Sequence, residues 1–312
     1  MAMVVAICTV AAQEREVVIA CDWGDISATL NTPTEGSDVA VLIVAGSGPT
    51  DRNGNSGPSL NTYAYKMLSD ALVKSGIAVL RYDKRAIGRS SVNDPAIIPN
   101  MVFDDFVDDA VRCVGYLRGE GFKRVVVAGH SEGGEIALHL ALREDVVVDG
   151  LVLLCCPGFP MDQILTAQLS AQLIPQHIGL MVTATTLMQR IKAGESVPVE
   201  SIPQELLSLF HPSVQPFLCS SMAFDPAELI SRVELPTLVI SGGRDIQVTK
   251  ENAERLIANA KCGEHIHFEQ MTHILKDADT SDRIQQLVNV YIHANLPITQ
   301  GLSEEVAEFV KP

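Results

Sequence analysis

The sequence predicts an α/β protein with an eight-stranded, mostly parallel sheet that is flanked by helices and carries further helices inserted after the sixth strand. Three observations support this prediction. Short apolar runs alternate with helical patterns through most of the 312 residues, as in βαβ units. One long stretch interrupts that alternation. A serine between glycines also follows one of the apolar runs directly.

Eight apolar runs bounded by turn residues are predicted to be strands. The first two have no helix between them, so they are expected to begin the sheet as an antiparallel pair joined through residues 22–25. The remaining runs are separated by helical patterns or loops, which favours parallel strands. The predicted strands are Val17–Cys21, Ile26–Thr32, Val39–Ala45, Ile77–Tyr82, Arg124–Ala128, Leu151–Cys156, Thr237–Ser241 and His265–Phe268.

Helical patterns lie between and after these strands. The clearest one places apolar residues from Phe103 to Leu117 at spacings of three and four, which is the period of an amphipathic helix. The other predicted helices are Tyr63–Lys74, Glu132–Arg143, Thr249–Ala260 and Asp282–Ala294.

From about residue 157 to 230 the strand–helix alternation stops. Helix-like pieces at Gln163–Leu173, Ile178–Ile191 and Pro203–Phe210 are separated by prolines, which end helices. We therefore expect a helical cap over the C-terminal edge of the sheet, within a single domain that covers residues 13–312. Apolar side chains of this cap can face a ligand or only pack on the domain below, and packing is the expected role for any single one.

Composition and charge limit the classes of partner that the protein can have. The chain is 47% hydrophobic and 20% charged, which is ordinary for a soluble globular protein with a sizeable core. Its formal net charge of −15 argues against a nucleic-acid partner and against an anionic membrane surface. No apolar stretch is long enough to span a bilayer. The oligomeric state stays open, and a homo-oligomer is one possibility.

The N-terminal residues indicate in which cellular compartment the protein is expected. Residues 3–12 are apolar apart from Thr9, and Val10-Ala11-Ala12 before Gln13 resembles a signal-peptidase site, although a positive n-region is lacking. We expect residues 1–12 to be a signal-peptide remnant of a periplasmic or secreted protein; the alternative is an extra apolar segment of a cytoplasmic protein.

The seven cysteines contain no Cys-x-x-Cys pair, so neither a disulfide framework nor a metal site is predicted.

The glycine-flanked serine lies in Val125–Gly134, where an apolar strand is followed by a predicted helix. Gly129 and Gly133 stand on either side of Ser131, at positions where a side chain would collide with the neighbouring backbone. This layout is typical of a nucleophile elbow. The structural alternative is a glycine-rich turn that only packs a βα unit.

A serine hydroxyl needs a neighbouring base, and the base needs a carboxylate that fixes its tautomer. Asp245 ends a glycine turn after the seventh strand, and His273 follows the eighth, which are the expected places for acid and base. Asp245 could instead only organise its turn, and His130 is expected to pack or to form local hydrogen bonds. Weaker candidates for the acid are Asp225, Glu234 and Asp277.

An oxyanion hole requires two backbone N–H groups aimed at one oxygen. The amide of Glu132 is the expected first donor. The second is expected in the glycine-rich loop of residues 45–55, at Ser47, with Gly48 as the next candidate. Phosphate binding by this loop is disfavoured, because no Lys-Ser/Thr pair follows it and no helix begins directly on it.

The chain resembles the α/β-hydrolases, and specifically the bacterial serine esterases with a Gly-Ser-Gly-Pro-x-Asp-Arg-x-Gly-Asn loop, which matches residues 46–55. The resemblance runs from about residue 15 to 295 and includes residues 81–90 and Asp225-Pro226. It implies esterase activity on small acyl esters, no metal or cofactor, and a helical cap that shapes the acyl pocket. Two departures are Ala45-Gly46 where the family has His-Gly, and Arg85-Ala86 where it has Arg-Gly.

The main hypothesis is a serine carboxylesterase acting on a small-molecule ester. An alternative keeps the same three side chains but acts on an acyl-CoA thioester or a peptide, and a third is a non-catalytic binding protein on a hydrolase fold. Basic residues near the fourth strand could meet the phosphates of CoA or could only form ion pairs with nearby carboxylates. They are Arg81, Lys84, Arg85 and Arg89.

Overall fold

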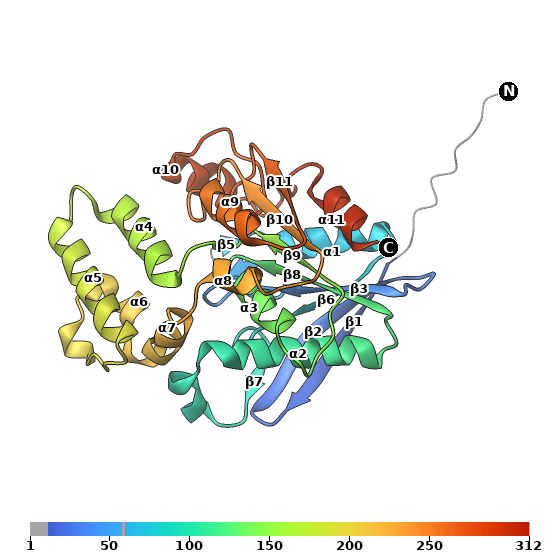
Figure 1. The fold of residues 1–312 in the computed structure, drawn as a ribbon, viewed down its shortest axis with the longest axis horizontal. Coiled ribbons are helices and arrows are strands. Elements are labelled where there is room, and N and C mark those ends of the chain that lie inside the picture. Colours follow the sequence, from blue (N-terminus) through green and yellow to red (C-terminus); the bar gives the residue numbers. More distant parts are fainter. Residues whose placement is uncertain (1–11, 58–59, 312) are drawn as a thin grey trace.

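The computed structural model describes residues 12–57 and 60–311. Its centre is a sheet with strand order β1-β2-β6-β3-β8-β9-β10-β11, to which the short β7 adds by pairing with β2 (Figure 1). All eight predicted strands are present, and the predicted fold class is confirmed. The bounds of the strands are β1 Ala12–Cys21, β2 Gly24–Pro33, β3 Val39–Val44, β6 Ala78–Tyr82, β7 Ser91–Val92, β8 Arg124–His130, β9 Gly150–Leu154, β10 Thr237–Gly242 and β11 Gly263–Phe268.

The sheet changes direction only near its first strands. β1 and β2 form the predicted antiparallel pair, and β2 is also antiparallel to β6. In sheet order, the six strands β6, β3, β8, β9, β10 and β11 run parallel to one another. The loops after them therefore meet at one edge of the sheet. β1 begins at Ala12 rather than at the predicted Val17. Its first five residues are exposed and mostly polar, so the sequence contains no apolar run there that would predict a strand.

Helices cover both faces of the sheet, and the strands are buried on both sides. Along β3, Ala40 and Leu42 pack in one apolar cluster, whereas Val41 and Ile43 pack in the other. The first cluster includes residues of α2 (Phe103–Gly119), α3 (Glu132–Ala141), α8 (Pro226–Ile230) and α9 (Lys250–Asn259). The second includes residues of α1 (Ala64–Lys74) and α11 (Leu302–Val310).

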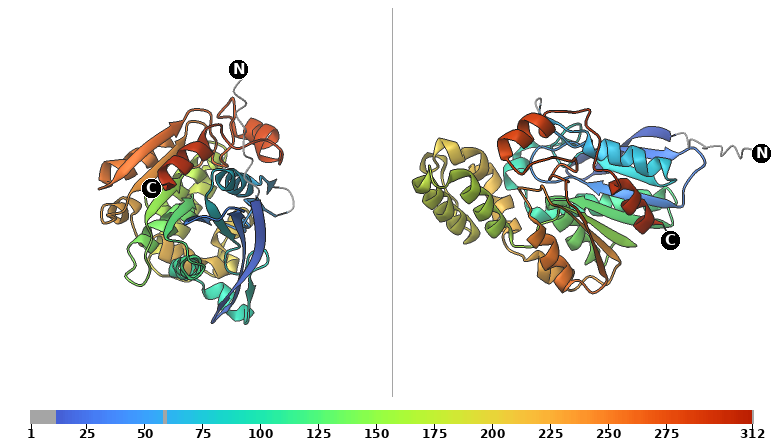
Figure 2. Two further views of the ribbon diagram at one scale, coloured as in Figure 1. Left: turned by 90° about the vertical axis from the view of Figure 1, so that its right-hand side faces the viewer. Right: turned by 90° about the horizontal axis from the view of Figure 1, so that it is seen from above.

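The stretch without strand–helix alternation forms a separate group of helices at one end of the molecule (Figures 1 and 2). We call it the helical insertion; it comprises α4 (Met161–Leu173), α5 (Ile178–Lys192), α6 (Leu207–Phe210) and α7 (Gln215–Ser221). Its buried side chains form a third apolar cluster, made of residues between Met161 and Met222. The following α8 instead packs against the sheet, because Leu229 and Ile230 belong to the first cluster.

Some elements differ from the predicted ones. The predicted helix Asp282–Ala294 is a short α10 (Arg283–Gln286) that continues as a π-helical turn over Leu287–Tyr291. α11 was not predicted. Further short elements are β4 Asn55–Ser56, β5 Leu60–Asn61 and 3₁₀ turns at Pro95–Asn100, Val199–Ser201, Gln204–Leu206 and Pro212–Val214.

The expected signal-peptide remnant lies outside the described residues, except for Ala12 at the start of β1. Within the part of the chain that is described, none of the helices combines the length and the apolar character needed to cross a bilayer.

Candidate functional site

The strand-to-helix turn after β8 has the backbone of a nucleophile elbow. Ser131 lies between β8 and α3 with φ 54° and ψ −125°, a conformation that is costly for any residue with a side chain. A Cβ on Gly129 would lie 2.1 Å from the carbonyl oxygen of Gly133, and one on Gly133 would lie 2.3 Å from that of Val44. Both glycines are therefore required for the close packing of strand, turn and helix.

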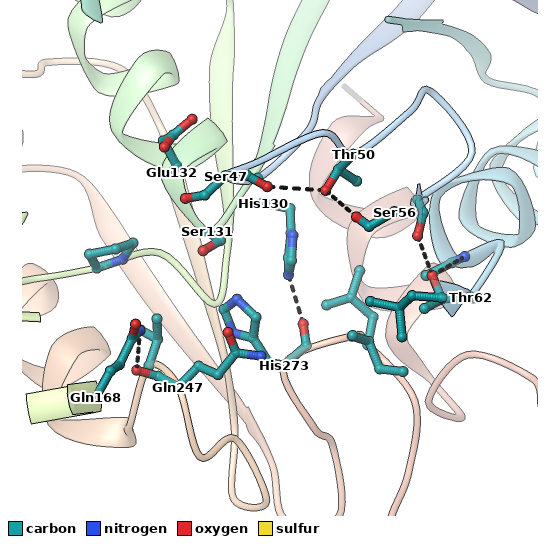
Figure 3. Close-up of a pocket in the computed structure, with 18 of the residues that line it drawn as sticks. Ser47, Thr50, Ser56, Thr62, His130, Ser131, Glu132, Gln168, Gln247 and His273 are labelled. Atoms are coloured by element: carbon teal, nitrogen blue, oxygen red, sulfur yellow. Dashed lines mark hydrogen bonds between the residues drawn. The ribbon is translucent and has the colours of Figure 1, made fainter. Parts of the chain in front are cut away.

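Ser131 opens onto a cavity of about 380 Å³ at the C-terminal edge of the sheet. The helical insertion supplies part of the wall, through apolar residues of α4 and through Leu209. The other sides come from the loops after β3, β8, β10 and β11. The polar lining residues labelled in Figure 3 are Ser47, Thr50, Ser56, Thr62, His130, Ser131, Glu132, Gln168, Gln247 and His273.

Asp245 and His273 are brought together as predicted. Nδ1 of His273 lies 2.7 Å from Oδ2 of Asp245, and both residues are buried. The other carboxylate oxygen, Oδ1, accepts the backbone N–H groups of Gln247 and Val248 at 2.8 and 2.9 Å. Asp245 thus organises its turn and holds the imidazole at the same time, so the two roles considered for it are compatible.

Ser131 and His273 line the same cavity, and Figure 3 shows them side by side within it. Among the hydrogen bonds of the described residues, none joins the hydroxyl of Ser131 to the ring of His273. Because hydrogen bonds of this kind are often long before a substrate is bound, the arrangement remains suited to proton transfer from the serine to the imidazole. His273 Nδ1 donates to Asp245, which leaves Nε2 as the nitrogen that can accept a proton.

The two expected oxyanion donors lie at the same end of the cavity as Ser131 (Figure 3). Glu132 is the first residue of α3, where a backbone N–H has no partner within the helix. Ser47 is exposed in the loop after β3. Gly46 precedes it, and a Cβ there would lie 3.1 Å from the Cβ of Ser131, so this loop packs directly against the elbow. Gly48 is in the left-handed region with φ 72°.

His130 connects the loop after β3 with the loop that carries His273. Its Nε2 lies 2.7 Å from the backbone carbonyl oxygen of His273, which can only accept, so Nε2 carries the proton (Figure 3). Burial lowers the pKa of His130 to about 3, so the ring is neutral and Nδ1 accepts. The hydroxyl of Tyr65 donates to Nδ1 at 2.7 Å and itself accepts the N–H of Gly46 at 3.2 Å.

From the sequence, His130 was expected to pack or to form local hydrogen bonds, and Tyr65 was not predicted to contribute to the site. The hydrogen bond from His130 to His273 joins residues 143 positions apart. No short-range pattern announces such a bond. The one feature of the sequence that indicated a role was the position of His130 directly before Ser131, which places its ring close to the other residues of the site.

The loop after β3 is also tied to the loop after β6. The backbone N–H of Arg52 and its guanidinium bond the two oxygens of Asp83, each at 2.7 Å. Arg52 and Asp83 are almost fully buried. In the loop after β6, Ala86 has φ 61°, a conformation that glycine adopts more readily than a residue with a Cβ. Alanine thus occupies a left-handed position in this loop.

The basic residues near β6 are engaged by carboxylates. Arg81 pairs with Glu14 at 2.8 Å, and Arg89 pairs with Glu16 at 3.0 Å. Lys84 and Arg85 pair with carboxylates that are themselves partly or fully buried. Of the two interpretations of this cluster, ion pairing is therefore the one that the contacts favour over contact with CoA phosphates.

One group of described residues approaches the spacing of a metal site. Ligand atoms of His130, Cys155 and His273 lie within 4.8 Å of one another. Both ring nitrogens of His130 are already hydrogen-bonded, and Nδ1 of His273 bonds Asp245. Burial and the nearby Asp245 carboxylate raise the pKa of the Cys155 thiol well above its usual range, which disfavours the thiolate that a metal needs. The group does not fit a metal.

The cavity continues outward. A neighbouring cavity of about 510 Å³ shares Leu60, Gln168, Gln247 and Tyr291 with it. The second cavity lies between α4 of the helical insertion and the segment of α10, and its charged lining residue is Arg283. We call the cavity at Ser131 the inner cavity and the adjoining one the outer cavity.

Comparison with known proteins is consistent with this geometry. Residues 60–279 match the hydrolase family described as serine aminopeptidase, S33. The chain belongs to this family of α/β-hydrolases. It is also similar to the esterase EstD of Thermotoga maritima, with 29% identity over 240 residues, which are 76% of this chain and 54% of that protein. The chain thus spans about half of the length of this curated relative.

Solved structures agree on the fold. An esterase of Pyrococcus furiosus superposes with a TM-score of 0.58 at 19% identity and covers 96% of this chain and 90% of its own. A proline iminopeptidase of Mycobacterium smegmatis has a TM-score of 0.58 at 17% identity, with 95% and 97% of the two chains covered. Esterases and peptidases share this architecture, so the fold alone does not choose between the two substrates.

Proposed function

We propose that this protein is a serine carboxylic-ester hydrolase that acts on small to medium acyl esters through an acyl-enzyme. Ser131 Oγ attacks the ester carbonyl while Nε2 of His273 takes its proton, and Asp245 stabilises the resulting imidazolium. The backbone N–H groups of Ser47 and Glu132 bind the oxyanion. The alcohol leaves with the proton from His273, and water then cleaves the acyl-enzyme by the same steps in reverse order.

One observation carries the proposal. The Asp245–His273 hydrogen bond of 2.7 Å stands next to a serine in a strained elbow, and His273 and Ser131 line one cavity. A buried carboxylate bonded to Nδ1 makes Nε2 the basic nitrogen of the ring. A scaffold that only binds a ligand has no use for this arrangement, and the similarity to EstD, an esterase, points in the same direction.

The lining of the cavity favours an ester over an aminopeptidase substrate. An aminopeptidase must neutralise the α-ammonium of its substrate, which calls for a free carboxylate near the nucleophile. Among the described residues that line the inner cavity, the carboxylate is Glu132, and its Oε1 is paired with Lys84 at 3.2 Å. The outer cavity adds Arg283, a positive charge. Neither feature suits a cationic amine.

A substrate panel on one preparation tests the proposal. p-Nitrophenyl esters of increasing acyl length, an acyl-CoA and an aminoacyl anilide are compared for kcat/KM. We expect the short and medium esters to be hydrolysed fastest. Ser131→Ala should lower kcat by at least about 10⁴-fold and abolish labelling by a fluorophosphonate probe, whereas Ser303→Ala, in α11, serves as the matched control. Preference for the anilide, or near-normal hydrolysis by Ser131→Ala, would overturn the proposal.

Asp245→Asn tests the role of the acid separately. The two backbone N–H groups at Oδ1 require an acceptor there, so the new amide NH₂ must face Nδ1 of His273. Nδ1 then has to accept, and the proton moves to Nε2, where it blocks the base. We expect kcat to fall by about 10³- to 10⁴-fold with little change in Tm. An unchanged kcat would show that Asp245 only organises its turn.

A further inference from the structure

Lys84 holds the peptide group that carries one of the proposed oxyanion donors. Its Nζ donates to the carbonyl oxygen of Gly46 at 2.6 Å. The carbonyl of Gly46 and the N–H of Ser47 belong to the same planar, trans peptide group and point in opposite directions. Fixing the carbonyl toward Lys84 therefore fixes the N–H of Ser47 away from it. A hydrogen bond to the carbonyl also polarises the N–H at the other side of the same amide.

The same ammonium group reaches the residue that carries the other donor. Nζ of Lys84 lies 3.2 Å from Oε1 of Glu132. The side chain of Glu132 thus bonds Lys84, whereas its backbone N–H is the first of α3 and has no acceptor within the helix. The exposed fractions of Lys84 and Glu132 are 3% and 4%. The ammonium group of Lys84 consequently contacts both the peptide group that contains the N–H of Ser47 and the side chain of Glu132, whose own N–H is the other proposed donor.

Burying two charges is expensive unless their geometry and hydrogen bonds compensate for the lost hydration. A simple apolar pair could pack the same space. The third side of the ammonium group faces the ring of Phe106, with Nζ 5.6 Å from its centroid. The charge is therefore placed at a defined point behind the loop after β3, and that point is where the peptide of Ser47 needs to be oriented.

We propose that the Lys84–Glu132 ion pair is a positioning pair for the oxyanion hole, which sets the N–H of Ser47 relative to the N–H of Glu132. The inference rests on the proposed hydrolase function. Lys84 does not line the inner cavity, and the carboxylate of Glu132 is held by Lys84. The pair acts by holding the two donors at one spacing, so its contribution appears when the oxyanion forms and is small when the substrate only binds.

The test compares two doubly neutral variants. Lys84→Met/Glu132→Gln removes the positioning pair without leaving a lone buried charge, and it keeps both backbone amides. The matched control, Arg85→Met/Asp109→Asn, removes the neighbouring buried pair, whose 2.7 Å contact ties the loop after β6 to α2 and does not involve the loop after β3. Both variants lose a buried ion pair, and the control also loses the contact of Arg85 with Asp105, so the control should lose at least as much stability.

The readouts are kcat and KM on a short p-nitrophenyl ester, the Ki of a trifluoromethyl ketone, and Tm. The ketone forms a hemiketal with Ser131 and places an oxyanion in the hole, so its affinity reports the donors directly. We expect Lys84→Met/Glu132→Gln to lower kcat by about 10- to 100-fold with KM within about twofold, and to raise Ki by the same factor as kcat falls. The control should lower Tm and leave kcat and Ki close to wild type.

Wild-type kcat and Ki in the folded Lys84→Met/Glu132→Gln variant would overturn the inference, and so would a loss of kcat that the control shares. If this variant does not fold, Glu132→Gln alone, which keeps an oxygen for Lys84, replaces it, and a parallel change of kcat and Ki is still required. Ser131→Ala distinguishes the proposed function from the positioning role. Esterase activity retained by Ser131→Ala refutes the proposed function. Loss of activity in Ser131→Ala together with wild-type kcat and Ki in Lys84→Met/Glu132→Gln refutes only the positioning role.

Discussion

The C-terminal edge of the sheet and the helical insertion build one cavity under very different constraints. At the sheet edge, backbone lies directly on backbone: a Cβ on Gly133 would approach the carbonyl oxygen of Val44 to 2.3 Å. In the insertion, Gly179 has nothing within 4 Å of the place of a Cβ, and the local cluster is rich in Met and Leu, which adapt to changes in packing. Reactive groups are thus held by rigid backbone contacts, and cavity shape is set by adjustable side chains.

The sharpest contrast is between alanine at Gly133 and alanine at Gly179. Gly133→Ala must displace the end of β3 or the start of α3, so we expect loss of the folded enzyme or destabilisation by more than about 4 kcal/mol. Gly179→Ala lies in the first turn of α5 and should stabilise slightly, by at most about 1 kcal/mol. Urea unfolding and esterase assays measure both.

A folded, active Gly133→Ala protein would break the comparison, because it would show that the elbow can shift by the required distance. A strongly destabilised Gly179→Ala would break it from the other side.

The sheet edge also contains a buried carboxyl without a partner. Glu135, in α3, has 0% exposure, and neither of its carboxylate oxygens has a hydrogen-bond partner in the described part of the chain. Burial, and the carboxylate of Glu132 nearby, raise its pKa well above the ordinary 4.5. The folded protein therefore keeps this group protonated at a pH where the unfolded chain has released the proton.

The sign of the pH effect follows. The stability that the protonated carboxyl contributes is fully present below pH 4.5 and is lost as the pH rises toward the raised pKa, at up to about 1.4 kcal/mol per pH unit. Glu135→Gln has no proton to lose, so its advantage over wild type should grow from pH 5 to pH 8. Denaturant unfolding of both proteins at the two pH values measures it; an equal difference at both would contradict the assignment.

Sequence patterns predicted best where one local rule decides the structure. The buried strands were found because apolar runs such as Val125–Ala128 are continuous, and the elbow because glycines on both sides of Ser131 are required by backbone contact. Asp245 and His273 were found because each follows a strand whose end lies at the same sheet edge. Their hydrogen bond confirms the predicted proximity, whereas their catalytic roles remain proposals.

The residues that support the site could not be predicted in the same way. Lys84 and Tyr65 act through bonds to the backbone of Gly46, 38 and 19 positions away, and no pattern in one segment records a contact with another. α11 was missed although Leu302, Val306 and Val310 recur every four residues on its buried face. The exposed Ile284, Leu287 and Val288 gave the segment of α10 a helical pattern without a buried stripe.

A substitution in the insertion should change specificity without changing the chemistry. Leu165 lies in α4 and lines the inner cavity, whereas Leu169, one turn later, packs in the same apolar cluster and is not among the lining residues. Leu165→Ala should raise kcat/KM for octanoyl relative to acetyl esters by about tenfold, because an enlarged apolar pocket gains about 1 to 3 kcal/mol per accommodated group. Leu169→Ala should leave this ratio unchanged, and equal ratios in the two variants would remove α4 from the acyl pocket.

The smallest expected effect compares two alanines in the two regions. Ala86, in the loop after β6, has φ 61°, a left-handed conformation that costs a residue with a Cβ about 1 kcal/mol or more. Ala193, at the end of α5, has φ −76°, where a Cβ is unstrained. Ala86→Gly relieves the strain but adds entropy to the unfolded chain, so stability should rise by about 0.5 kcal/mol, whereas Ala193→Gly should lower it by a similar amount. Opposite signs in urea unfolding are the expected result; a loss of stability in both would mean that the backbone of the loop at the sheet edge is not strained at Ala86.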